Sequence, residues 1–207
     1  MQLPKELDFR LEVRNAMRCR EIFKDHPRVH VPKVYPELTS LRVLVMSFEE
    51  GVSVTKVREM HEMGIDLKSV AKCISEAFVH MTYEKGFVHG DPHPGNMFIR
   101  KKQGGGPEDV ELVLLDHGIY CELSDESRIN YSILWRGILD QNEEMIKNAS
   151  HALGAELHEL FAAMMADRKY EDLMDESKKL NLKSRLKDQH GQEVRKERRN
   201  AAMKLEK

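Results

Sequence analysis

A nine-residue loop constrains this chain more than any other feature of its sequence. Residues 88–96 read V-H-G-D-P-H-P-G-N, so Asp91 and Asn96 stand in a segment whose prolines and glycines favour a tight turn. A further acid, Asp116, follows an apolar run and precedes His117 and Gly118. Carboxylate and amide oxygens are the ligands that hard divalent cations prefer. The three side chains can therefore share a cation if the chain folds back after Asn96.

The segments around the loop predict that the chain does fold back. Residues 67–83 carry apolar side chains at helical spacing, which predicts a helix that leads into the loop. A short strand is expected over 97–99 and a second over 110–115, with a Gly- and Pro-rich turn at 101–109 between them. This order of helix, loop and hairpin brings Asp116 back to the loop.

Protein kinases use the same order of side chains. Their catalytic-loop Asp is followed by an Asn that binds magnesium, and then by a D-x-G Asp that also binds magnesium. By this correspondence Asp91 is the catalytic residue, Asn96 and Asp116 bind Mg²⁺, and ATP is the cofactor. A lone D-x-x-x-x-N is more often an exposed turn with solvated side chains. The hypothesis rests on the whole string, with Asp116 placed directly after a strand.

The details of these motifs resemble the UbiB-like atypical kinases, the aarF-domain-containing kinase family. The loop reads H-G-D-P-H-P-G-N where ordinary protein kinases have H-R-D-x-x-x-x-N, and residues 116–118 read D-H-G where they have D-F-G. Near the N-terminus, Glu6 and Asp8 resemble the family's E-x-D signature, and Glu12 follows them. The resemblance covers about residues 3–150. It implies an α+β, protein-kinase-like fold, mainly the helical C-lobe with a few N-lobe strands.

The resemblance also implies where a nucleotide binds. Residues 29–34 and 41–48 are β-rich runs separated by a turn signal, so we expect a hairpin. Met46 takes the gatekeeper position, and the backbone of Ser47, Phe48 and Glu49 faces the adenine.

By the same resemblance, Glu6, Asp8 and Glu12 belong to the cofactor-binding set. In the family, the helix Glu at the position of Glu12 pairs with a nucleotide-binding Lys. Only eleven residues precede Glu12, and neither a strand Lys nor the family's K-x-G-Q signature is present among them. A kinase N-lobe normally carries that Lys and a phosphate-covering loop before this helix. We therefore expect a fragment or truncated form that is catalytically incomplete as it stands.

The second half of the chain has a helical pattern with a change in composition near its end. Helices are expected from Ser124 or Asp125 onward, over 142–153 and over 155–166. Residues 178–207 hold eleven Lys or Arg and four acids, which is typical of a solvated helix or frayed tail. The predicted domains are a partial kinase-like domain over 1–170 and a charged helical or disordered tail over 171–207.

Composition limits the partners. The net charge is -2, so nothing demands nucleic acid, and no apolar run reaches the length of a membrane span. The three cysteines share no metal-binding spacing, and no secretory signal is visible. The resemblance implies a nucleotide, a lipid or isoprenoid-quinone-related ligand and peripheral membrane contact. It also implies a mitochondrial location, with plastid or bacterial cytoplasm as alternatives.

Other functions stay open. Small-molecule phosphotransferases of the aminoglycoside and choline kinase type also carry an H-G-D-x-H-x-x-N loop, but usually have an aromatic residue where this chain has His117. A metal-dependent hydrolase would use His89, Asp91 and His93 as ligands, although no second ligand cluster accompanies them. A non-catalytic, pseudokinase-like binding module is the remaining alternative.

Overall fold

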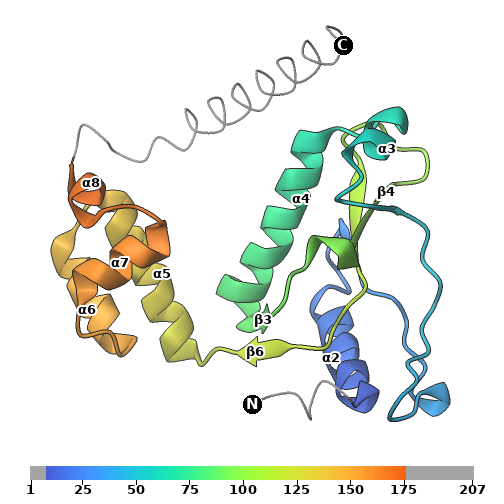
Figure 1. Cartoon of the computed structure of the whole chain (residues 1–207), viewed down its shortest axis with the longest axis horizontal. Coiled ribbons are helices and arrows are strands. Elements are labelled where there is room, and N and C mark those ends of the chain that lie inside the picture. The colour runs from blue at the N-terminus through green and yellow to red at the C-terminus, as the bar shows by residue number, and fades with distance from the viewer. Residues whose placement is uncertain (1–7, 176–207) are drawn as a thin grey trace, which may run out of the picture. The chain divides into compact units, whose positions relative to one another are not determined.

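The computed structural model describes residues 8–175, and these divide into two compact units, Met1–Arg128 and Ile129–Lys207 (Figure 1). Each unit is described by itself. The predicted boundary at residue 170 stays a prediction, and residues 176–207 of the predicted tail lie outside the described part. In the described residues, no helix combines the length and apolar character needed to cross a membrane.

The first unit contains a four-stranded sheet in the order β1-β5-β4-β2. Its central strands are β4 (Met97–Lys101) and β5 (Val110–Leu114), which form an antiparallel hairpin with Met97 opposite Leu114. The outer strands are β1 (Val29–His30), parallel to β5, and β2 (Val52–Ser53), antiparallel to β4. The predicted hairpin is confirmed, and the β5 side chains of Val110 and Leu112 are fully buried.

The predicted helix before the loop is confirmed as α4 (Leu67–Val79), which packs against β5. Asp66 caps its N-terminus by accepting a hydrogen bond from the Ser69 amide at 2.9 Å. Cys73 lies on the buried face, with none of its surface exposed. The helix then widens into a π-helical turn, His80–Lys85, and ends at Gly86, whose φ of 61° favours glycine.

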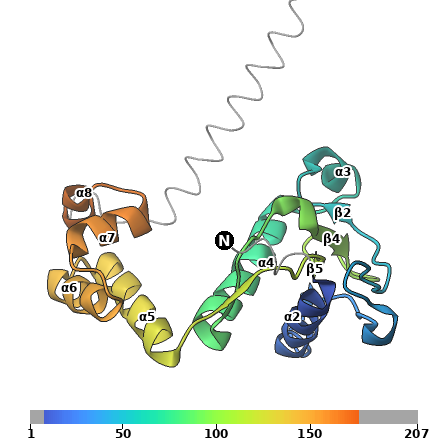
Figure 2. The ribbon, with the colours of Figure 1, turned by 60° about the horizontal axis from the view of Figure 1, so that its bottom comes forward.

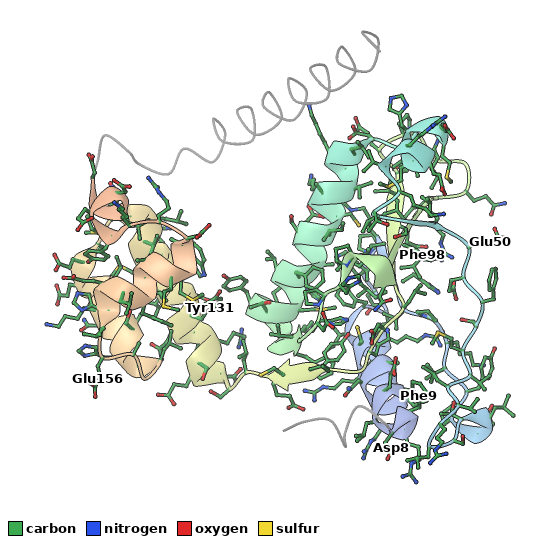
Figure 3. All side chains as sticks on the ribbon, viewed as in Figure 1. Asp8, Phe9, Glu50, Phe98, Tyr131 and Glu156 are labelled. Atoms are coloured by element: carbon green, nitrogen blue, oxygen red, sulfur yellow. The ribbon has the colours of Figure 1, made fainter. Side chains whose placement is uncertain are left out.

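Helix α2 (Phe9–Ile22) precedes the sheet in the chain, and Figure 3 labels Asp8 and Phe9 at its start. Asp8 is the N-cap residue, since its carboxylate accepts a hydrogen bond from the Arg10 amide at 3.0 Å. Val13 and Ala16 are buried on one face of α2 and pack in a cluster with Val34. This face of α2 therefore packs against the segment that follows β1.

The predicted hairpin over 29–34 and 41–48 forms only in part. Val34 and Met46 make an isolated antiparallel bridge, and the Tyr35 amide bonds to the Val45 carbonyl at 2.9 Å. Outside these contacts, the expectation of a regular strand over 41–48 was wrong, and a 3₁₀ turn at Pro36–Leu38 (η1) replaces a tight hairpin turn. Proline has no amide hydrogen to donate; Pro32 interrupts the first run of residues, and Pro36 starts the 3₁₀ turn.

Four short elements complete the described part of the first unit. Strand β3 (Phe87–His89) leaves the π-helical turn and pairs antiparallel with β6 (Tyr120–Glu122). Helix α3 (Val57–Glu62) follows β2, and a 3₁₀ turn, η3 (Pro94–Asn96), leads from the loop into β4. The loop of residues 88–96 is thus held by a strand at one end and a 3₁₀ turn at the other.

The described part of the second unit is helical, as predicted (Figure 2). Helix α5 (Asp125–Asp140) begins four residues before the unit boundary, and Ser124 caps it through a hydrogen bond from the Ser127 amide. It is followed by α6 (Glu143–Ala152), α7 (His158–Ala166) and α8 (Tyr170–Met174). The core is built from apolar side chains of all four helices: Leu134, Ile138, Ile146, Ala149, Ala162 and Leu173.

Candidate active site

The side chain of His89 joins the loop to the acid that follows β5. It lies at the end of β3, and its Nε2 is 2.9 Å from the Asp116 carbonyl oxygen. Its Nδ1 accepts a hydrogen bond from the Asp91 amide at 3.2 Å. A neutral ring with the proton on Nε2 satisfies both contacts. Burial lowers the pKa of His89 and favours this neutral form. His89 therefore supports the loop backbone.

The two residues predicted to bind magnesium are in direct contact. The Asn96 side-chain amide donates to Oδ2 of Asp116 at 2.7 Å, and the Gly118 amide donates to Oδ1 at 2.9 Å. The backbone is tied at the same point, because the Leu115 amide bonds to the Asn96 carbonyl at 3.0 Å. These contacts hold hard oxygen ligands side by side at the mouth of the hairpin.

Asp91 is held by its backbone and leaves its carboxylate exposed to solvent. The His93 amide donates to the Asp91 carbonyl at 2.8 Å, and the Gly90 amide donates to the Ile119 carbonyl at 2.8 Å. Within the described residues, no hydrogen bond or ion pair engages the Asp91 carboxylate. A carboxylate held in this way is free to accept a proton or to orient a hydroxyl group.

Helix α2 reaches the site through two side chains. The His117 amide donates to Oε1 of Glu12 at 3.2 Å, and Nδ2 of Asn15 donates to the His117 carbonyl at 2.9 Å. Burial raises the pKa of Glu12, and the Asp116 carboxylate raises it further. Among the described residues, no Lys or Arg pairs with Glu12. The sequence motifs did not indicate Asn15. Its partners, the carbonyls of His117 and Gly118, are 102 and 103 positions away in the sequence and meet it only in the folded chain.

His117, the middle residue of D-H-G, is a buried structural residue. Its Nδ1 is 2.9 Å from the Tyr120 hydroxyl oxygen, and its Nε2 is 3.1 Å from the Leu114 carbonyl. Burial lowers the pKa of His117 to about 4, so the ring is neutral near pH 7. Its ring and that of Tyr120 are nearly parallel, with centroids 5.9 Å apart. Tyr120 was not predicted, and no motif in the sequence marks it.

The predicted adenine-side segment is only partly available for a ligand. The Ser47 amide donates to the Lys33 carbonyl at 2.7 Å, so that donor is already used. The Glu49 carboxylate accepts from Arg100 at 2.8 Å and from the Ser47 hydroxyl at 2.7 Å. Phe48 is 91% exposed, which leaves it free to contact a ligand. Met46 is half-buried beside Val34.

Asp8, the second acid of the E-x-D signature, is engaged at the start of α2. Asp8 caps α2 and forms an ion pair with Arg10 at 2.8 Å, and Glu6 lies outside the described residues. The hydrogen bond from the Arg10 side chain lowers the pKa of Asp8. The role of both acids in binding a cofactor stays a prediction.

Comparison with known proteins identifies the family of the chain. A family model described as the ABC1 atypical kinase-like domain matches residues 1–150. The chain belongs to the ABC1 atypical kinase-like family. The predicted resemblance to the aarF-domain-containing kinases and the predicted kinase-like α+β fold are thereby confirmed.

Relatives of this ABC1 chain extend well beyond it. AarF domain-containing kinase 1 of Drosophila melanogaster is 42% identical over 175 residues, which cover 83% of this chain and 33% of the relative. The probable serine/threonine-protein kinase abkB of Dictyostelium discoideum is 32% identical, with coverage of 90% and 27%. The chain thus spans about a third of the length of these curated relatives.

One solved structure shares the fold. It is the complex of Rv3197 with erythromycin from Mycobacterium tuberculosis, with a TM-score of 0.50 and 22% sequence identity. The match covers 70% of this chain and 35% of that chain. At this identity the likeness shows the fold alone.

The ligand set of the hydrolase alternative does not form in this ABC1 chain. Both ring nitrogens of His89 are occupied by backbone partners. Nδ1 of His93 accepts a hydrogen bond from the Gly95 amide at 3.0 Å. A metal held by His89, Asp91 and His93 would have to replace the contacts that shape the loop.

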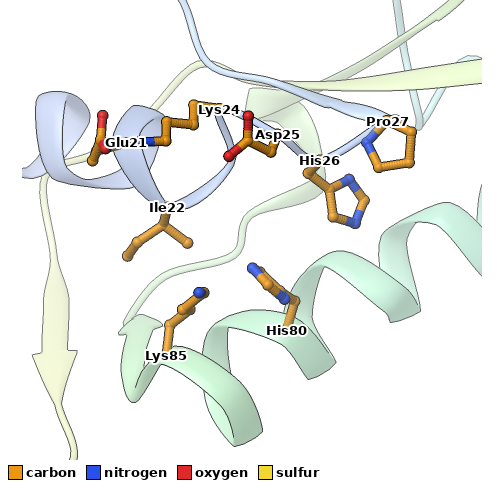
Figure 4. Close-up of a pocket in the computed structure, with 8 residues that line it drawn as sticks. All are labelled: Glu21, Ile22, Lys24, Asp25, His26, Pro27, His80 and Lys85. Atoms are coloured by element: carbon orange, nitrogen blue, oxygen red, sulfur yellow. Dashed lines mark hydrogen bonds and ion pairs between the residues drawn. The ribbon is translucent and has the colours of Figure 1, made fainter.

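A cavity of about 470 Å³ lies apart from these residues, between the end of α2 and the π-helical turn (Figure 4). It contains two acidic and two lysine side chains, so its formal charge favours neither anions nor cations. Its lining consists of Glu21, Ile22, Lys24, Asp25, His26, Pro27, His80 and Lys85. None of the residues of the candidate active site lines it.

Gly90 fills a position where the loop passes very close to Ile119. A Cβ atom at Gly90 would lie 2.6 Å from Cγ2 of Ile119, a contact that forces the loop or the strand to shift. We expect Gly90→Ala to lower the free energy of unfolding of the first unit by about 1–3 kcal/mol, the usual cost of overpacking. Urea unfolding measures the change.

Gly106→Ala is the matched control, since a Cβ atom there would meet only Asp109 Oδ2, at 3.7 Å. If both variants unfold at the same urea concentration as the unchanged chain, the close approach of Gly90 to Ile119 is not a constraint on the loop.

Proposed function

We propose that this chain is the catalytic portion of an ATP- and Mg²⁺-dependent atypical kinase or ATPase. The observation that carries the proposal is the contact between Asn96 and Asp116, with Asp91 on the same loop as Asn96. In phosphoryl transfer the protein positions the groups and stabilises charge, with little covalent chemistry of its own. A fixed pair of oxygen-bearing side chains next to a free carboxylate meets that need.

The residues fit magnesium by their chemistry. Asn96 and Asp116 supply an amide oxygen and a carboxylate, and no sulfur or imidazole atom takes part in their contact. Bound Mg²⁺ would neutralise the charge that develops on the phosphate oxygens. Asp91 would orient an acceptor hydroxyl or water and accept its proton. The buried His89 would keep Asp91 and Asp116 at a constant separation, because it contacts the backbone of both.

On the nucleotide side, the proposal uses Met46, Ser47, Phe48 and Glu49. The exposed ring of Phe48 offers an apolar surface to an adenine, whereas the side chain of Glu49 is engaged with Arg100. Glu12 would pair with a Lys that is supplied from outside the described residues. Its present contact with the His117 amide keeps it directed at the D-H-G segment.

The substrate and location are proposed on family grounds. The two relatives described above are named as kinases, and that of Dictyostelium discoideum is named a probable serine/threonine-protein kinase. We propose an acceptor or ligand related to lipids or isoprenoid quinones, reached by peripheral membrane contact, and a mitochondrial location. A small-molecule phosphotransferase of the aminoglycoside or choline kinase type is the second candidate, because it shares the H-G-D-x-H-x-x-N loop.

Calorimetric titration with ATP tests the proposal. The sample is this chain joined to the N-terminal lobe of a family member, with Mg²⁺ and then with excess chelator. We expect ATP to bind with Mg²⁺ and binding to be lost with chelator, because the phosphates need the cation to lie beside Asp116. Equal affinity in both conditions would refute a magnesium-dependent site.

A further inference from the structure

Three side chains meet where the first turns of α6 and α7 approach each other in the second unit. They are Glu143 at the start of α6, and His158 and Glu159 at the start of α7. One ligand atom from each, a carboxylate oxygen or a ring nitrogen, lies within 4.8 Å of the other two. In the described residues, no other group of three or more His, Cys, Asp or Glu side chains meets this condition.

The two carboxylates lack the partner that would normally balance them. Neither Glu143 nor Glu159 forms an ion pair with a basic side chain in the part of the chain that the structure describes. Like charges at this separation repel each other. The helix dipole favours an acidic side chain in the first turn of a helix, which explains the position of each glutamate taken by itself. It does not account for their convergence on an imidazole.

Two buried polar atoms beside the carboxylates also lack partners. Nε2 of His158 and the hydroxyl oxygen of Tyr170 are both shielded from solvent and make no hydrogen bond. The two rings lie edge to face, with centroids 6.1 Å apart. The Tyr170 ring thus adjoins the imidazole of the cluster. Buried polar groups without partners are costly and call for an explanation.

We propose that Glu143, His158 and Glu159 bind one divalent transition-metal ion, with zinc as the best match. An imidazole nitrogen with two carboxylate oxygens is a donor set that suits zinc better than magnesium or calcium, which prefer oxygen alone. Three protein ligands leave at least one position for water. The ion neutralises the two unpaired carboxylates and links α6 to α7.

This site is independent of the proposed kinase chemistry. All of its residues belong to the helical unit, and it shares no side chain with Asp91, Asn96 or Asp116. Its effect would be on the helical unit, since an ion that binds the folded state alone stabilises that state by mass action.

Titration of the whole chain with zinc chloride, after treatment with chelator, tests the proposal. We expect one zinc ion to bind per chain at this cluster and the melting temperature of the helical unit to rise. Glu143→Gln and Glu159→Gln should each weaken this binding at least about tenfold, because each removes a charged ligand. In the absence of zinc, both variants should be as stable as the unchanged chain or more so, since they relieve repulsion between like charges.

Matched controls separate this site from other zinc contacts. Glu144→Gln and Glu156→Gln alter exposed acids next to the cluster in sequence, and Glu156 is labelled in Figure 3. His93→Ala alters the kinase-type loop. All three should bind zinc as the unchanged chain does. The proposal is overturned if the unchanged chain binds no zinc. It is also overturned if the Glu143 and Glu159 variants bind zinc with unchanged affinity.

Discussion

Asp116→Asn should abolish Mg²⁺-dependent ATP binding and turnover in this chain once it is joined to the N-terminal lobe of a family member. Asparagine has nearly the same shape, but it removes the only negative charge of the Asn96–Asp116 pair. It also replaces one of the two carboxylate oxygens of Asp116. These oxygens accept hydrogen bonds from the Asn96 side chain and from the Gly118 amide. We expect turnover to fall by at least about a hundredfold, the scale at which loss of one preorganised electrostatic contact acts.

The control for this variant is Glu108→Gln, which removes an exposed carboxylate in the turn between β4 and β5. It should leave ATP affinity and turnover unchanged. Circular dichroism and the melting temperature establish that both variants are folded. Unchanged ATP affinity and turnover in Asp116→Asn would remove the central claim that this acid binds the magnesium of the nucleotide.

The chain of 207 residues alone should show no ATP turnover above background, and joining the N-terminal lobe should restore it. The physical reason lies at Glu12, which is half-buried and has no cationic partner among the described residues. A phosphate-binding Lys supplies a fixed positive charge that Mg²⁺ does not replace, and an open site leaves the phosphates in water, where electrostatic stabilisation is weak. Phosphate release in the presence of Mg²⁺ and ATP measures turnover in the chain alone and in the joined protein.

Asp91→Ala provides the decisive comparison for this second prediction. In the chain alone the variant should behave as the unchanged chain does, and in the joined protein it should lose turnover. Robust turnover by the chain alone that disappears in Asp91→Ala would show that an N-terminal lobe is dispensable for turnover. The expectation of a catalytically incomplete chain would then be wrong.

The contact between Asn96 and Asp116 was predictable because its determinants are local. A Gly- and Pro-rich turn joins two short apolar runs, and such runs pair in a hairpin that returns the chain to its starting point. The fixed register of that hairpin, with Met97 opposite Leu114, puts the residues before and after it side by side. The helix before the loop was also predictable from its period of apolar residues.

The parts that were missed depend on contacts between distant segments. Asn15 bonds to His117 across 102 positions, and neither residue type carries a pattern that indicates the other. Tyr120 supports His117 from a strand of three residues, too short for a clear alternation of apolar and polar side chains. Segment 41–48 shows the opposite error, because a strand was predicted there and none forms. Its residues favour β-structure, but they lack regular pairing partners.

The π-helical turn at His80–Lys85 has a consequence for how this fold tolerates length changes. A π turn holds one more residue than the α-helical turn it replaces, so it is equivalent to a one-residue insertion. Removing one residue there would restore α-helical geometry and leave everything that follows in nearly the same orientation, because the wider turn already contains the extra residue. Strand β3 begins two residues later and carries His89. A single deletion in this turn would thus leave the imidazole that connects Asp91 to Asp116 in place, whereas a single deletion within α4 would rotate that imidazole by about 100° about the helix axis.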